Sequence, residues 1–147
     1  MHQVFLGGTC GSNPWREQLV IPGLLARGIP AQALFNPVVA QWDAQAQARE
    51  DEAKRTATYQ LYVIANPDPQ AQTANLSAYS LVELVMALYD APERTVVVFA
   101  TTGMADHTAK AIRKAAQDLY ERFPSAPIFT DYTDAVEWLA AHLQPHV

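Results

Sequence analysis

Short apolar runs alternate with longer stretches of helical periodicity, and this alternation constrains the fold more than any other feature of the sequence. The runs have the length of strands, while the intervening stretches repeat their apolar residues every three or four positions. Such a pattern is typical of βαβ units that build a parallel sheet. We therefore predict five strands, at Val4–Gly8, Ala33–Asn36, Tyr59–Ala65, Thr95–Ala100 and Pro127–Phe129.

Capping and breaking residues divide the stretches between these runs into helices. Asn13 and Pro14 start the first helix, Pro22 interrupts it and Gly28 ends it. Right-handed crossovers then favour a flavodoxin-like α/β fold: a doubly wound five-stranded parallel sheet of order 2-1-3-4-5, with helices on both faces. At 147 residues the chain fits one domain, residues 1–147. The other predicted helices span residues 45–57, 76–89, 105–123 and 133–143.

Composition narrows the class of protein. The chain has 10 basic and 15 acidic residues, a net charge of -5, which argues against binding to a nucleic acid polymer. The sequence shows neither a signal peptide nor an apolar run of the roughly 18 residues that cross a bilayer, so we predict a cytoplasmic protein without a membrane partner. Cys10 is the only cysteine and the histidines are isolated. We therefore predict no disulfide, no metal and no other cofactor.

Polar or small residues follow the predicted strands where each one ends. The first strand runs into Gly7, Gly8 and Thr9, the second into Asn36 and the third into Asn66. In an open parallel sheet, ligands bind beyond the carboxyl ends of the strands, where the strand order reverses. We therefore expect these residues to bind a ligand in a crevice between the loops after the first and third strands. The glycines suit a close approach of the backbone to that ligand, but they also suit a simple turn.

Two tryptophans are candidates for stacking on a nucleobase. Trp15 opens the first helix, and Trp42 lies in the polar loop after the second strand. An aromatic ring stacks on any base, because every base has a π face. A tryptophan at the head of an amphipathic helix also suits the core, so Trp15 has two interpretations.

The tetrapeptide Ser80-Leu81-Val82-Glu83 also has two interpretations. It matches a capping box, in which Ser80 is the N-cap and Glu83 reaches back to the backbone N–H of the cap. Alternatively, Glu83 is a carboxylate in the first turns of a helix that points at the crevice. The helix dipole keeps such a group ionised, and an ionised carboxylate can attack an anomeric carbon.

Taken together, these motifs resemble the nucleoside 2-deoxyribosyltransferase-like family over roughly residues 3–90. The resemblance is carried by Val4-Phe5-Leu6-Gly7-Gly8, Trp15-Arg16, Phe35-Asn36-Pro37 with Trp42, and Ser80-Leu81-Val82-Glu83-Leu84. It implies a double displacement at C1′ of a nucleoside or nucleotide, in which Glu83 displaces the base and a second base or water releases the glycosyl-enzyme. It further implies binding loops at residues 7–9, 36–42 and 66–68. It also implies a homo-oligomer, in which the 102–107 loop of a neighbouring copy completes the pocket.

Two positions depart from the pattern of this family. Phe5 stands where the family often has a tyrosine that orients the nucleophile, and Gln60 stands where an aspartate is frequent. The proton donor for the leaving base is therefore not assigned by the resemblance. Because a covalent glycosyl mechanism needs a second carboxyl group about 5 Å from the first, we predict Asp68 as this donor and Asp43 as the second choice.

Two other functions stay open at this point. The segment from Ser80 to Leu84 also resembles the glutamate motif of TIR domains, which implies hydrolysis of NAD. The missing tyrosine and aspartate favour a non-catalytic module that binds a nucleotide. A receiver-type phosphoacceptor is disfavoured, because the third strand ends in Asn66 rather than in an aspartate.

Overall fold

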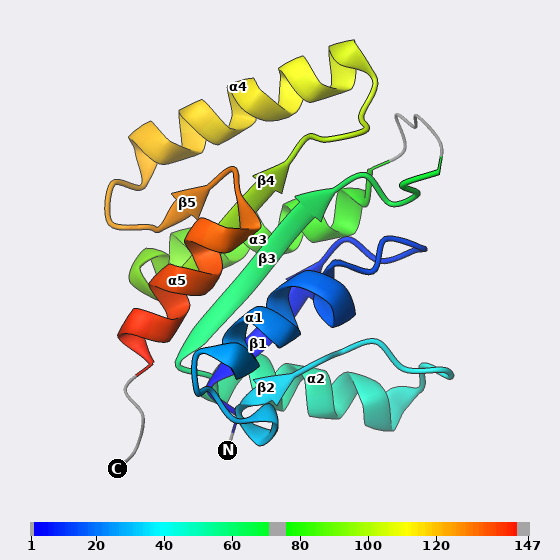
Figure 1. Cartoon of the computed structure of the whole chain (residues 1–147), viewed down its shortest axis with the longest axis vertical. Helices are drawn as coiled ribbons and strands as arrows, with labels where there is room; N and C mark the ends of the chain where they lie inside the picture. Colours follow the sequence, from blue (N-terminus) through cyan, green and yellow to red (C-terminus); the bar gives the residue numbers. More distant parts are fainter. Residues whose placement is uncertain (1, 71–75, 144–147) are drawn as a thin grey trace.

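The computed structural model describes residues 2–70 and 76–143, and its centre is a five-stranded parallel sheet of order β2-β1-β3-β4-β5 (Figure 1). The predicted flavodoxin-like order 2-1-3-4-5 is confirmed. The five strands are β1 (Val4–Gly8), β2 (Leu34–Phe35), β3 (Tyr59–Ala65), β4 (Thr95–Ala100) and β5 (Ile128–Phe129).

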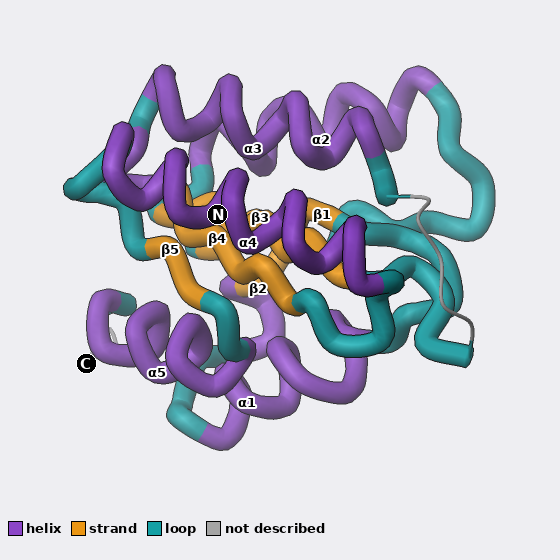
Figure 2. Tube along the Cα trace, turned by 90° about the horizontal axis from the view of Figure 1, so that it is seen from above, coloured by secondary structure: helices purple, strands orange, loops and turns teal. Residues whose placement is uncertain are grey.

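Helices cover both faces of the sheet, as predicted for a doubly wound fold. Figure 2 shows α1 (Ile21–Ala26) and α5 (Tyr132–His142) on one side, with α2 (Ala44–Thr56), α3 (Ala78–Asp90) and α4 (Asp106–Arg122) on the other. Shorter helical turns lie at Arg16–Val20, Ala31–Ala33 and Pro92–Arg94, and the first of these is π-helical and leads directly into α1. None of the described helices is both long and apolar enough to span a lipid bilayer.

Alternation along the central strands divides the core into two clusters. Successive side chains point to opposite faces of a strand. Leu6 and Val63 therefore pack with α1 and α5, while Phe5 and Tyr62 pack beneath α2, α3 and α4. Because both faces are covered, the central strands are apolar over most of their length, as parallel strands in such folds are.

Helix α3 begins before the predicted capping box. Its N-cap is Ser77, whose Oγ accepts a hydrogen bond from the backbone N of Ser80 at 3.3 Å. Ser77 has an extended backbone, whereas Ser80 already lies inside the first turn and is buried. The capping-box interpretation of Ser80 and Glu83 is therefore wrong. Glu83 lies in the second turn, where its side chain is not needed to cap the helix.

Gly8 ends β1 in a conformation that favours glycine. Its φ is +114°, and a Cβ atom there would lie 2.1 Å from the carbonyl oxygen of Val63. The neighbouring strand is in register at this point, because Gly8 pairs with Val63 of β3. Since that oxygen belongs to the backbone of the central strand, it cannot move away without disturbing the sheet.

We expect Gly8→Ala to lower the free energy of unfolding by about 3 kcal/mol or more, because it adds a backbone clash to conformational strain. Gly28→Ala is the matched control: its φ is +87°, but nothing lies within 4 Å of the added Cβ. That substitution should cost about 1 kcal/mol, the strain alone. Urea denaturation of both variants measures the difference, and equal losses would contradict the close approach at Gly8.

Candidate functional site

A cleft of about 380 Å³ opens at the end of β1, between the loop after β2 and helices α2 and α3. Its floor includes Gly7 and Gly8 of β1, and its walls come from segments that are far apart in the sequence. The carboxyl end of a parallel strand is where ligand sites form in this class of fold. The lining of this cleft includes Phe5, Gly7, Gly8, Arg16, Trp42, Glu50, Tyr79, Ser80 and Glu83.

The loops after β1 and β3, between which we predicted the crevice, are joined by hydrogen bonds. The backbone N of Thr9 donates to the Val63 carbonyl at 2.8 Å, and the Thr9 Oγ1 accepts from the backbone N of Ala65 at 2.9 Å. The Asn13 Nδ2 donates to the Asn66 carbonyl at 2.8 Å. These bonds engage polar groups that we expected to face a ligand. The cleft therefore lies toward β2 and α3 rather than between the loops after β1 and β3.

Trp15 and Arg16 bind the carbonyl groups at the end of β1. The Arg16 guanidinium donates to the carbonyls of Leu6 at 3.0 Å, Thr9 at 3.0 Å and Gly8 at 3.2 Å. The Trp15 Nε1 donates to Thr9 as well, at 2.8 Å, and the Trp15 ring is fully buried. The prediction that Trp15 stacks on a base is therefore wrong, since no part of its ring is accessible.

The guanidinium of Arg16 keeps its charge although it is buried. Burial lowers the pKa of Arg16, and the neighbouring Cys10 and Glu17 act in the opposite direction. An arginine remains protonated at neutral pH even after such a shift. Three carbonyl oxygens accept three of its five N–H donors, so Arg16 shapes the floor of the cleft.

Glu83 belongs to a cluster of three charged side chains, with Glu50 and Lys54 of α2. The Lys54 ammonium donates a hydrogen bond to the Glu83 Oε2 and lies 3.3 Å from the Glu50 Oε1. Burial lowers the pKa of Lys54, but the hydrogen bond and charge of Glu83, together with Glu50, outweigh it and raise that pKa. At neutral pH the Glu50–Lys54–Glu83 cluster therefore holds one ammonium group between two carboxyl groups.

A second cavity of about 430 Å³ lies on the other side of this cluster. Glu83 borders both cavities, Glu50 lines only the cleft, and Lys54 lines only the second cavity. Tyr62 also lines the second cavity and donates a hydrogen bond to the Gln60 Oε1 at 2.7 Å. Burial first, and then the charges of Glu83 and Glu50, raise the pKa of Tyr62, so its phenol stays neutral.

The structure brings together half of the predicted site residues. Those that line the cleft are Gly7, Gly8, Trp42, Ser80 and Glu83. Those that do not line it are Thr9, Trp15, Asn36, Asn66 and Asp68.

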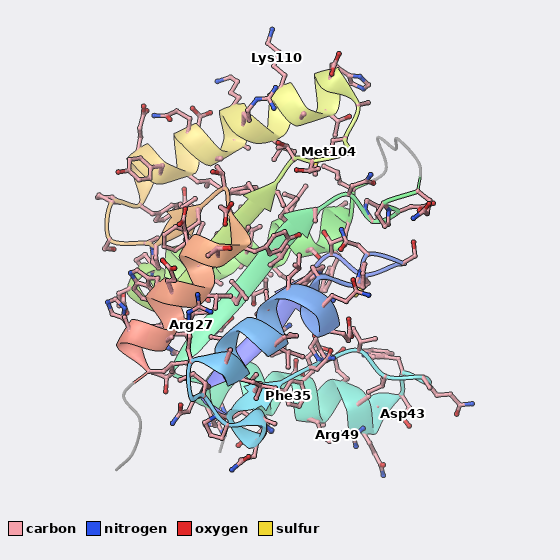
Figure 3. All side chains as sticks on the ribbon, in the orientation of Figure 1. Arg27, Phe35, Asp43, Arg49, Met104 and Lys110 are labelled. Atoms are coloured by element: carbon pink, nitrogen blue, oxygen red, sulfur yellow. The ribbon has the colours of Figure 1, made fainter. Side chains whose placement is uncertain are left out.

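The residues outside the cleft hold loops in place. The Asn36 Oδ1 accepts from the backbone N of Val38 at 3.0 Å, and the Asn66 Nδ2 donates to the Gly103 carbonyl at 3.0 Å. Asp68 accepts from the Ser12 Oγ at 3.4 Å. Asp43, which is labelled in Figure 3, is the N-cap of α2. Neither predicted proton donor thus lines the cleft with Glu83.

Glu50 and Lys54 were missed by the sequence analysis. They lie in a polar, alanine-rich helix whose composition suggests a solvent-facing position. Their spacing of four residues is a signal for an ion pair along one helix face. The sequence has no comparable signal that α3 would bring Glu83 to the same ammonium. Among residues 2–70 and 76–143, no group of three His, Cys, Asp or Glu side chains is placed to hold a metal ion.

No family model matches the chain, and no curated protein matches it either. The resemblance to the nucleoside 2-deoxyribosyltransferase-like family therefore rests on the short motifs alone. Any function has to be argued from the chemistry of the cleft.

We expect Arg16→Lys to lower the free energy of unfolding by about 2 to 4 kcal/mol, because a lysine cannot satisfy three buried carbonyls that are arranged for a guanidinium. Arg27→Lys is the matched control, since that arginine is more exposed and contacts the Gly23 carbonyl and Glu137. Its substitution should change stability by less than about 1 kcal/mol. Urea denaturation measures both values, and a loss for Arg16→Lys no larger than the control would show that the buried contacts do not hold the strand end.

Proposed function

We propose that the protein cleaves or transfers the N-glycosidic bond of a nucleoside or nucleotide, with Glu83 as the nucleophile. One observation carries this proposal: the Glu83 carboxyl group lines a cleft of about 380 Å³ at the end of β1, with one oxygen bonded to Lys54. In the described part of the chain, the other oxygen has no hydrogen-bond partner. A carboxylate fixed through one oxygen has the other available for attack on C1′.

The walls of the cleft suit a base and a sugar. Trp42 lines it and is 62% exposed, so its ring is available for stacking. Gly7 and Gly8 form part of its floor, and their missing side chains leave room for the rings of Phe5 and Tyr62 and for the backbone of Val63. A volume of this size is within the range of small-molecule sites. These features suit a ligand with one flat ring, such as the base of a nucleoside.

The reaction would proceed in two steps. The Glu83 oxygen forms a bond to C1′ while the bond from C1′ to the base nitrogen breaks, and its electron pair leaves with the base, which takes up a proton. In the second step a water oxygen, or the nitrogen of another base, forms a bond to C1′ and the Glu83 ester bond breaks. The incoming group loses a proton, and Glu83 is again a carboxylate.

Glu50 replaces Asp68 and Asp43 as the candidate for the proton transfer. It is the second carboxyl group that lines the cleft, and it contacts the same ammonium as Glu83. Covalent glycosyl transfer uses two carboxyl groups about 5 Å apart, and two groups that share one ammonium have a separation of this order. In this proposal the leaving base takes up its proton from solvent, and Glu50, a carboxylate before attack, accepts the proton of the incoming group.

A non-catalytic module that binds a nucleoside or nucleotide is the second candidate. The ion pair with Lys54 favours it, because a salt-bridged carboxylate is stabilised in its resting state. Hydrolysis of NAD, as in TIR domains, uses the same attack of a glutamate on an anomeric carbon. NAD is therefore one of the substrates to be assayed.

The homo-oligomer implied by the family resemblance is part of the proposal. An apolar stripe on the outer face of α3 supports it, because large apolar surfaces tend to be covered by a partner. The stripe consists of Tyr79, Val82, Met86 and Tyr89, each more than half exposed. The cytoplasmic location stays a prediction.

We expect the wild-type protein to release free base from deoxynucleosides, nucleotides or NAD, and Glu83→Gln to lower kcat by at least about a thousandfold, because it removes the nucleophile. Liquid chromatography of each mixture, with and without a free acceptor base, separates hydrolysis from transfer. Intact mass spectrometry tests for a sugar bound to the protein.

Glu137→Gln provides the control, because Glu137 is exposed on α5 and pairs only weakly with Arg27 at 3.6 Å. It should keep the wild-type kcat. Absence of turnover by the wild type, or an unchanged kcat in Glu83→Gln, would overturn the proposal. Calorimetric binding without product would establish the non-catalytic module instead.

We expect Trp42→Ala to raise KM about tenfold or more, while Trp42→Phe keeps most of the affinity, because stacking on a base contributes about 1 to 3 kcal/mol. Steady-state kinetics with the best substrate measures this. Tyr120→Ala is a suitable control, since Tyr120 lies on α4 with 60% of its surface exposed and does not line the cleft. An unchanged KM in Trp42→Ala would show that the base lies elsewhere.

A further inference from the structure

We propose that Lys54 is the positioning residue for the nucleophile, in the role that the resemblance assigns to a tyrosine hydroxyl in the first strand. This inference rests on the proposed function, because it assumes that Glu83 attacks C1′. It assigns Lys54 no contact with the substrate. Lys54 acts through Glu83, which it holds by one oxygen.

The placement of Lys54 separates it from the substrate. Its ammonium donates to the Glu83 Oε2, whereas Lys54 itself lines only the cavity behind the cluster and not the cleft. Only 11% of the Glu83 side chain is accessible, and 20% of the Lys54 side chain. A ligand in the cleft would therefore meet the carboxyl group of Glu83 and not the ammonium group.

Three elements fix the ammonium in this position. Glu50, one turn earlier on α2, lies 3.3 Å from it, and Glu83 binds it from α3. The ring of Phe5 in β1 lies beneath it, with its centroid 5.3 Å from the Lys54 Nζ. A cation above an aromatic face is attracted by the ring quadrupole. Phe5 thus lacks the hydroxyl of a tyrosine, but its ring supports the Lys54 ammonium, which takes the place of that hydroxyl.

The backbone around Lys54 is also fixed. Its carbonyl accepts hydrogen bonds from the Gln60 Nε2 at 3.2 Å and from the Arg94 guanidinium at 3.5 Å. Arg94 donates further to the carbonyl of Ala57, at 2.6 Å. The last carbonyls of a helix have no partners within the helix, so these bonds hold the end of α2 in place. The position of Lys54 is therefore set before a ligand arrives.

The shared ammonium suits both steps of the reaction. When Glu83 is esterified it loses its charge, and Lys54 would be left as an uncompensated buried cation if Glu83 were its only partner. Glu50 remains as that partner. With one cation and two carboxylates, the cluster also carries a net negative charge before attack, which stabilises the positive charge that develops on the sugar.

The test is a single-turnover measurement with enzyme in excess over the nucleoside. The sugar-bound protein is quantified by intact mass, and at saturating concentrations of enzyme its appearance gives a first-order rate constant that does not depend on the fraction of folded protein. We expect Lys54→Met to lower this constant about 10- to 100-fold, because a misplaced nucleophile loses that much. Lys54→Arg should recover most of the rate, and Lys54→Gln should fall between Arg and Met.

Lys114→Met is the matched control, because Lys114 also pairs with an acidic residue four positions away, Asp118 at 3.3 Å, but on the exposed face of α4. It should keep the wild-type rate constant. Thermal denaturation identifies any variant that fails to fold. The rate constants are then compared among the Lys54 variants that do fold. A wild type that forms no glycosyl-enzyme overturns the proposed function and this inference with it. An active wild type whose rate constant is unchanged by the neutral substitutions overturns only the role of Lys54.

Discussion

The site depends on one buried interaction, between the Arg16 guanidinium and the carbonyl groups at the end of β1. A strand that leaves a sheet exposes carbonyls that no neighbouring strand pairs, and burying them unpaired costs free energy. Arg16 satisfies three of them, and Trp15 donates to Thr9 as well. The chain can therefore turn sharply at Gly8 while remaining in the core. Without this interaction the floor of the cleft would have no fixed shape.

The hydrogen bonds of Thr9 decide on which side of β1 the cleft opens. Thr9 is bonded to Val63 and Ala65 of β3, so the loops after β1 and β3 are closed against each other. The cleft lies toward β2, whose two residues leave room for the loop that carries Trp42. The rule that ligands bind where the strand order reverses gives the correct edge of the sheet. Hydrogen bonds then close the side of β1 that faces β3, so the cleft lies on the side that faces β2.

The fold could be predicted from the sequence because its signals are local. Apolar runs locate β3 and β4, and right-handed crossovers then restrict their order. The site could be predicted only in part. One interpretation took Ser80 as an N-cap because it precedes Glu83 by three residues, whereas the N-cap of α3 is Ser77. Glu50 and Lys54 were missed because their partner Glu83 lies 29 residues away from Lys54 along the chain, and no spacing rule connects α2 to α3.

The charge balance around Glu83 depends on which donor binds its carboxyl group. A hydroxyl donor would orient Glu83 without changing the charge of the site, whereas an ammonium neutralises it. The second carboxyl group, Glu50, restores the negative charge. Burial raises the pKa of Tyr62, and the charges of Glu83 and Glu50 raise it further, so the phenol behind the cluster stays neutral. Glu50, Lys54 and Glu83 therefore form one electrostatic unit, in which a single ammonium lies between two carboxyl groups.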